Sequence, residues 1–276
     1  MKKIGLALGA GGARGLAHIV FLEAFEELGI KPSVISGTSI GAIIGAVYAA
    51  GISAKEMKEA VNEIVFSKKT KFWEIHKKSD IIKMFNFIDP DYHVGGMIKG
   101  EKFVKFLFEH MRIDKFEDLQ IPLKIIATNY WNKEEVILEK GNLLQAIRAS
   151  FSLPGLFSPV DINGTLLMDG GMVNPLPYDI LKDDCDITAA IDVSAKKVKT
   201  EESTPPAYEI LFSAFQIMQN SIVQEKFKQS QPDILIKTNI QDVRIHEFTK
   251  AASIFEQVLT SKDELKREIE KHLNNC

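Results

Sequence analysis

The chain has 276 residues, 45% of them apolar, and its 34 Lys and Arg against 37 Asp and Glu give a formal net charge of −3. This length and composition suffice for one large buried core, and a chain without a basic excess is not typical of nucleic-acid-binding proteins. Cys185 and Cys276 are too few for a disulfide framework, and no apolar run reaches the roughly 18 residues of a membrane-spanning helix. We therefore expect a cytoplasmic protein, at most peripheral to the inner membrane surface.

The first predicted strand, residues 4–8, runs into the loop Gly9-Ala10-Gly11-Gly12-Ala13-Arg14-Gly15. Glycines that open a helix leave backbone N–H groups free to bind an anion, and the helix dipole assists them. A dinucleotide site would need glycine in place of Arg14, and a P-loop would need a following Gly-Lys-Ser/Thr. The apolar run after Met1 is too short for a secretory signal, so we expect it to be retained.

The second predicted strand, residues 34–36, leads into Gly37-Thr38-Ser39-Ile40-Gly41. This G-x-S-x-G pattern is typical of a nucleophile elbow, where a strand turns sharply into a helix and exposes the serine hydroxyl. The residues that follow are apolar and small, which favours a buried helix that ends at Gly51.

Residues 66–88 combine six lysines with only Glu74 and Asp80, a local charge of +4, and are rich in aromatic and aliphatic side chains. Such a composition suits either a cap over a cleft or a surface that contacts an anionic membrane. We favour a cap or lid over residues 66–100, and the two roles are compatible.

Further strands are predicted at 123–128, 135–138, 165–168, 187–192 and 234–237, and helices near residues 15, 39, 53, 100, 143, 205 and 246. This alternation predicts one α/β domain over residues 1–276, with a mainly parallel central sheet covered by helices on both faces. Residues 196–206 are polar and predict an exposed loop, and residues 261–271 predict a terminal helix with a solvated, charged face.

Asp169 follows the strand predicted at 165–168 and precedes Gly170 and Gly171. Its carboxylate is therefore expected at the carboxyl end of a strand, the edge where open α/β sheets bind ligands. An isolated Asp-Gly-Gly is more often an ordinary turn.

Four motifs together resemble those of the patatin-like phospholipases, over about residues 3–195. They are, in the family's order, Gly11-Gly12-Ala13-Arg14-Gly15, Gly37-Thr38-Ser39-Ile40-Gly41, Ala149-Ser150-Phe151-Ser152-Leu153-Pro154, and Asp169-Gly170-Gly171 followed by Asn174-Pro175. Ala10 departs from the pattern, since many relatives have glycine there.

The resemblance implies a patatin-like three-layer fold with a helical cap, and a serine acyl hydrolase that cleaves carboxylic esters of lipids without a cofactor or metal. It assigns Ser39 and Asp169 to a catalytic Ser-Asp dyad and the N–H groups of Gly11 and Gly12 to the oxyanion hole. Arg14 would either support the loop or attract a substrate phosphate.

Three alternatives remain open. His246 is the one histidine beyond Asp169 outside the terminal tail, as a Ser-Asp-His triad requires, although the glycine loop follows the first strand and not the third as in α/β-hydrolases. An acyltransferase could use the same serine. A non-catalytic regulatory or membrane-binding protein is disfavoured by the intact motifs. His18 and Arg148 are expected in supporting roles.

Overall fold

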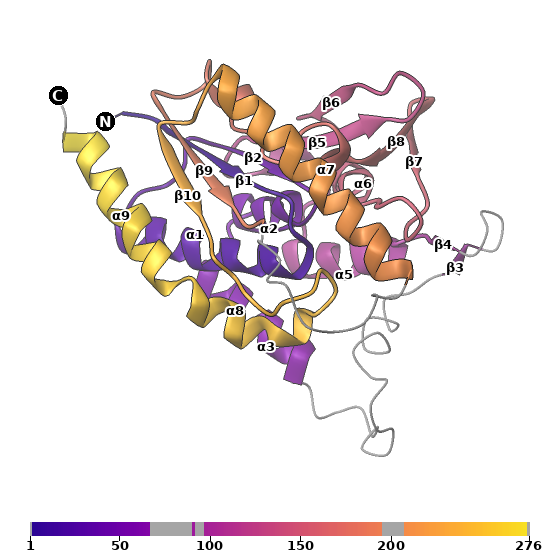
Figure 1. Ribbon diagram of the computed structural model, residues 1–276, viewed down its shortest axis with the longest axis horizontal. Helices are drawn as coiled ribbons and strands as arrows, with labels where there is room; N and C mark the ends of the chain where they lie inside the picture. Colours follow the sequence, from indigo (N-terminus) through magenta and orange to yellow (C-terminus); the bar gives the residue numbers. More distant parts are fainter. Residues whose placement is uncertain (1, 67–89, 92–96, 195–206, 275–276) are drawn as a thin grey trace.

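The computed structural model describes residues 2–66, 90–91, 97–194 and 207–274, and its centre is a mixed β-sheet (Figure 1). The strands follow the order β10 (Ile234–Lys237), β9 (Ile187–Asp192), β1 (Ile4–Leu8), β2 (Val34–Thr38), β5 (Leu123–Asn129), β8 (Thr165–Asp169) and β7 (Val160–Ile162), and β6 (Glu135–Leu138) also pairs with β5. The first five strands in this order are parallel, and β6, β7 and β8 form antiparallel pairs.

Helices cover both faces of the sheet. They are α1 (His18–Glu27), α2 (Ile40–Ala49), α3 (Ala54–Phe66), α5 (Glu101–Met111), α6 (Leu143–Ser150), α7 (Ala207–Gln229), α8 (Ala251–Gln257) and α9 (Leu259–Asn274). The 3₁₀ turns η1 (Gly12–Ala17), η3 (Phe116–Asp118), η4 (Gly170–Met172), η5 (Asp179–Leu181) and η6 (Phe248–Lys250) connect the elements, and β3 (Pro90–Asp91) pairs with β4 (Met97–Ile98). The predicted α/β class, with a mainly parallel sheet between helices, is confirmed.

The two faces of the sheet pack against different clusters of apolar side chains. In β1, Leu6 and Leu8 point into a large core shared with α1, α2, α8 and α9. Ala7 points to the opposite face, where it joins a smaller cluster with Tyr178 and with Val223 of α7. Alternate residues of a strand face opposite sides, so β1 contributes to both clusters.

Most strands lie within one or two residues of the sequence prediction, whereas the three-residue β7 was not predicted. Residues 67–89 of the predicted cap and the predicted loop at 196–206 lie outside the described residues. No helix in the described part of the chain is long and apolar enough to span a membrane.

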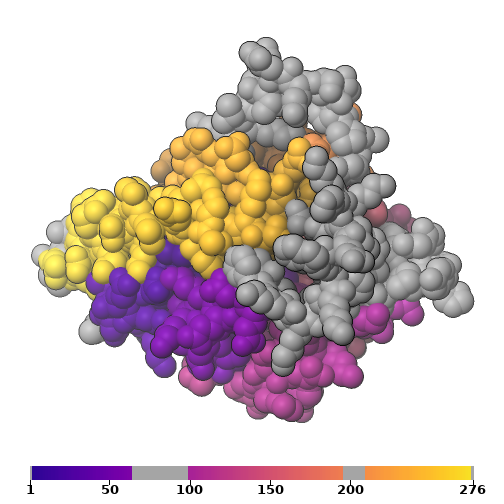
Figure 2. Space-filling model, turned by 90° about the horizontal axis from the view of Figure 1, so that it is seen from below, coloured from indigo at the N-terminus to yellow at the C-terminus, as the bar shows by residue number. Residues whose placement is uncertain are grey.

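The terminal helix α9 is more tightly attached than a solvated helix would be. Leu265 and Ile269 are fully buried, and Lys262 is only 8% exposed. Figure 2 shows α8 and α9, in yellow, against the indigo and purple amino-terminal segments. The sequence prediction of a helix here is confirmed, but one side of this helix belongs to the core.

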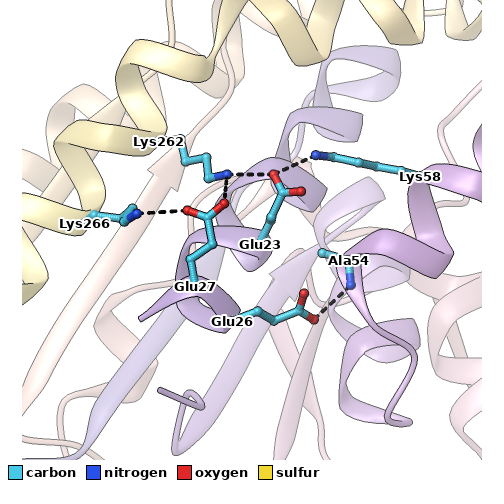
Figure 3. Close-up of polar contacts among 7 residues, drawn as sticks. All are labelled: Glu23, Glu26, Glu27, Ala54, Lys58, Lys262 and Lys266. Atoms are coloured by element: carbon cyan, nitrogen blue, oxygen red, sulfur yellow. Dashed lines mark hydrogen bonds and ion pairs between the residues drawn. The ribbon is translucent and has the colours of Figure 1, made fainter. Parts of the chain in front are cut away.

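Lys262 is buried because it joins a network of ion pairs between three helices (Figure 3). Its ammonium contacts Glu23 at 2.8 Å and Glu27 at 2.5 Å, both on α1. Lys58 of α3 also contacts Glu23, at 2.7 Å, and Lys266 of α9 contacts Glu27, at 2.9 Å. Burial lowers the pKa of Lys262, but its hydrogen bonds to the two glutamates outweigh this effect and the pKa lies above its ordinary value.

We predict that Lys262→Met destabilises the fold by about 1–3 kcal/mol, because it removes charge-assisted hydrogen bonds from two partly buried carboxylates. The matched control is Lys271→Met on the same helix, where an exposed lysine pairs with Glu268 one turn away. That control should change the free energy of unfolding by less than about 0.5 kcal/mol. Urea unfolding measures both values, and equal effects would contradict the role of Lys262.

Candidate active site

Ser39 occupies the sharp turn between β2 and α2. Its φ of 56° and ψ of −118° form a backbone conformation that residues other than glycine rarely adopt. A Cβ atom at Gly41 would lie 2.1 Å from the carbonyl oxygen of Leu8, so only glycine fits where α2 passes the end of β1. This is the geometry of a nucleophile elbow, and it leaves the Ser39 side chain half-buried.

The hydroxyl of Ser39 donates a hydrogen bond to Oδ2 of Asp169 over 2.8 Å. The register of the sheet explains why two residues 130 positions apart meet. Thr38 of β2 pairs with Ile126 of β5, and the next residue of β5, Ala127, pairs with Asp169 of β8. Ser39 and Asp169 therefore stand at the same level of the sheet, on either side of β5.

The carboxyl of Asp169 lies in a site with little solvent, since the residue is only 2% exposed. Burial raises its pKa from 3.8 to about 7, although hydrogen bonds from the Gly171 N–H and from Ser39 act in the opposite direction. The Gly171 N–H donates to Oδ1 over 2.7 Å. One carboxyl oxygen is thus held by the backbone while the other faces the serine.

The backbone around this pair is fixed by buried hydroxyl groups. Ser150 Oγ accepts a hydrogen bond from the Ser39 N–H over 2.9 Å, and Thr128 Oγ1 donates to the Asp169 carbonyl over 2.8 Å. Ser152 Oγ donates to the carbonyl oxygen of Arg148. These hydrogen bonds hold the backbone of the site in place. Ser150 and Ser152 are at most 1% exposed, so neither is accessible as a nucleophile.

The glycine loop lies between β1 and α1, next to the turn that carries Ser39. Hydrogen bonds of 2.8 Å join the Ala10 N–H to the Pro175 carbonyl and the Ala13 N–H to the Ile245 carbonyl. Gly11 and Gly12 lie between these two hydrogen-bonded residues, and their N–H groups have no acceptor in the described part of the chain. Gly12 has a φ of +57°, and a Cβ atom there would lie 2.5 Å from the Ile245 carbonyl oxygen. The loop therefore needs glycine and presents two adjacent free donors.

The side chain of His18 supports the start of this loop. The residue is fully buried, and Nε2 lies 2.8 Å from the carbonyl oxygen of Gly9. A carbonyl only accepts, so Nε2 carries the proton and Nδ1, which has no partner among the described residues, does not. Burial lowers the pKa of His18 to about 4, against a smaller effect of this hydrogen bond, so the ring is neutral at pH 7.

Arg14 belongs to the glycine loop, and His246 follows Ile245, whose carbonyl oxygen accepts from the Ala13 N–H. Arg14 is 5% exposed, and Nη1 donates to the Val243 carbonyl oxygen over 3.3 Å, which favours loop support over substrate binding. His246 belongs to the same carboxy-terminal turn. Because the Ser39 hydroxyl contacts Asp169 directly, no imidazole stands between these two groups. Arg148 of α6 lies 3.5 Å from Glu101 of α5, and its side chain is 22% exposed.

Sequence reasoning did not identify several residues that hold the site. The carbonyl oxygens of Ile245 and Val243 act through the backbone and therefore leave no pattern in the sequence. Asn174 accepts from Lys226 of α7 over 2.6 Å through its side chain, and its carbonyl oxygen accepts from Thr38 Oγ1 over 2.7 Å. The Asn174-Pro175 pair after Asp169 was the sequence signal from which this role of Asn174 could have been inferred.

A serine hydroxyl bonded to a buried carboxyl beside two free backbone donors defines the type of site found in serine acyl hydrolases. The chain belongs to the patatin-like phospholipase family, whose model matches residues 6–182. An uncharacterized NTE family protein of Mycobacterium tuberculosis is 31% identical over 205 residues, 74% of this chain and 52% of that protein. Lysophospholipase NTE1 of Kluyveromyces lactis is 32% identical over 220 residues, 79% of this chain and 14% of that protein.

The family resemblance inferred from the motifs is thus confirmed. The chain spans about half, or less, of the length of these curated relatives. Among solved structures, the crystal structure of VipD from Legionella pneumophila has the same fold, with a TM-score of 0.51 and 15% identity over 95% of this chain and 67% of that chain.

We predict that the free energy of unfolding of Asp169→Asn, minus that of the wild type, is larger at pH 8 than at pH 4.5. Because the folded-state pKa of Asp169 is raised to about 7, wild-type stability should fall as pH rises from about 4 to about 7 and then level off. Asparagine carries no charge, so this loss is absent from the variant.

Thermal melts at several pH values measure the difference between variant and wild type. Asp161→Asn, which removes an exposed carboxyl on β7, is the matched control for the loss of one formal charge. A pH-independent difference for Asp169→Asn would show that Asp169 is not held in an unfavourable charged state.

Proposed function

We propose that the protein is a serine esterase that hydrolyses acyl esters of lipids through a Ser39–Asp169 dyad. The observation that carries the proposal is the direct 2.8 Å hydrogen bond from the Ser39 hydroxyl to a buried carboxyl. A serine hydroxyl is a weak nucleophile until a positioned base takes its proton, and Asp169 is the group in reach. Burial, which raises the pKa of Asp169 to about 7, makes this carboxylate a stronger base than an exposed aspartate.

In the proposed reaction, Ser39 Oγ attacks the ester carbonyl carbon while its proton passes to Asp169 Oδ2. The carbonyl oxygen becomes an oxyanion and accepts hydrogen bonds from the Gly11 and Gly12 N–H groups. The intermediate collapses, the carbon–oxygen bond to the alcohol breaks, and Asp169 returns the proton to the departing alcohol. Water then attacks the acyl-serine, giving its proton to Asp169, and the acid leaves as Ser39 regains its hydrogen.

A lipid ester is the substrate class that the comparisons support. The family is that of the patatin-like phospholipases, and one relative of 32% identity is named a lysophospholipase. We further propose that residues 1–276 form one domain, because β10, α8 and α9 complete the sheet and core that the matched region begins.

The experiment that tests the dyad compares Ser39→Ala and Asp169→Asn with the wild type on a small soluble ester and on a lysophospholipid. Ser39→Ala should abolish turnover of both. Asp169→Asn keeps the shape of the site but removes the proton acceptor, so kcat should fall by about 10²-fold or more. Ser33→Ala, which removes a hydroxyl at the end of β2 opposite Ser39, controls for non-specific damage and should stay active. Turnover of Asp169→Asn near the wild-type value, with His246→Ala inactive, would favour the triad instead.

We also predict that His18 acts on the rate through the glycine loop. His18→Leu removes the donor to the Gly9 carbonyl and should lower kcat by about 10²-fold with KM little changed, because a small displacement of the oxyanion donors weakens the transition state and not substrate binding. His18→Gln retains an amide donor and should restore most of the rate. Full kcat in a folded His18→Leu protein would remove His18 from this role.

A further inference from the structure

Helix α7 has two very different sides. Its inner side packs on the sheet through Val223, which is buried, and through Lys226, which bonds Asn174. Its outer side exposes four large apolar residues: Ile210 at 48%, Leu211 at 58%, Ile217 at 65% and Met218 at 57%. The two pairs stand seven residues apart, which is two helical turns, so all four share one face. We call these four residues the α7 apolar face.

The α7 apolar face lies on a stretch without charge. Residues 210–223 contain no Asp, Glu, Lys or Arg, and a helix of this length extends for about 20 Å. Charged residues return only at the carboxyl end of the helix, from Glu225 onward. Glu209, just before the face, is paired with Arg244, and the face itself offers no charge to a charged protein partner or an anionic headgroup.

The position of α7 connects this face to the catalytic pair. Gln219 of α7 packs closely on Gly171, whose N–H donates to Asp169. A Cβ atom at Gly171 would lie 2.1 Å from Nε2 of Gln219. A Cβ atom at Gly155 would come within 3.8 Å of Leu211. Figure 1 shows α7, in orange, crossing over the sheet as a single long helix. The apolar face is therefore carried by the same helix that covers the Asp169 turn.

We propose that the α7 apolar face docks the protein on the surface of a lipid bilayer or micelle, beside the site that takes the lipid ester. The proposal rests on the proposed function for its choice of substrate. The face is a helix side and not a groove, and apolar helix faces of this kind enter the boundary between headgroups and acyl chains by about 5–10 Å. Because the face is uncharged, docking depends on apolar contact and extends to zwitterionic lipid.

A second copy of the chain is the competing occupant, and the size of the face argues against it. Four aliphatic side chains that are about half exposed offer on the order of 400 Å², since even a large aromatic side chain buries only about 150–250 Å². A standard interface takes about 800 Å² from each partner. The face is too small for a stable dimer by itself, whereas a lipid surface needs no matching partner surface.

The test measures co-sedimentation with phosphatidylcholine vesicles, using proteins that carry Ser39→Ala so that the lipid stays intact. The Ile217→Gln/Met218→Gln variant should lower the vesicle-bound fraction about tenfold. The matched control, Ile137→Gln/Leu259→Gln, changes two exposed aliphatic residues on β6 and α9, at 43% and 49%, and should bind like the parent. Binding of the parent should not weaken between 0.1 M and 1 M NaCl, where charge attraction would be screened.

The same substitutions with Ser39 intact should leave turnover of a small soluble ester unchanged, which shows that the fold and site are preserved. Three results would overturn the proposal: no vesicle binding by the parent, equal binding by the α7 variant, or a parent dimer that this variant converts to a monomer. Failure of the proposed function is seen separately, as soluble-ester turnover that survives Ser39→Ala, and the vesicle measurement does not depend on it.

Discussion

The hydrogen bond between the Ser39 hydroxyl and the Asp169 carboxyl is the interaction on which the site depends. It needs three independent features of the fold: a strained turn after β2, an antiparallel β8 in register with β5, and burial of the carboxyl. Burial is unfavourable for a charged aspartate, and the raised pKa records that cost. The same burial makes the carboxylate more basic than an exposed aspartate, so a locally unfavourable feature of the structure supports the role that we propose for Asp169.

The glycine loop depends on parts of the chain that lie far from it in sequence. His18 holds its start and the Ile245 carbonyl holds its end, which leaves the Gly11 and Gly12 donors between two fixed points. Ile245 lies beyond the region that the family model matches, residues 6–182. The ion pairs of α9 with α1 then attach the carboxy-terminal segment to the helix that carries His18. The carboxy-terminal part of the chain thus contributes to the shape of the site as well as to stability.

The fold could be predicted from the sequence because its elements left local patterns, and the residues that we propose for the site were chosen from patterns of the same kind. Apolar runs marked the strands, and small residues around Ser39 and after Asp169 marked turns where a side chain would collide with backbone. The three-residue β7 was missed because so short a strand has no detectable alternation. The Ile245 carbonyl could not be found because every residue has one. Lys262 was read as part of a solvated face because its partners, Glu23 and Glu27, come from another helix.

The most direct test of the central claim is covalent labelling with a fluorophosphonate probe, followed by mass spectrometry of the labelled peptide. The probe reacts with an activated serine hydroxyl and leaves a stable mark on it, so it reports nucleophilicity without assuming a substrate. The account predicts that Ser39 alone is labelled and that Asp169→Asn slows the labelling strongly. Labelling at Ser150 or Ser152, or labelling of Ser39 at an unchanged rate in Asp169→Asn, would contradict it.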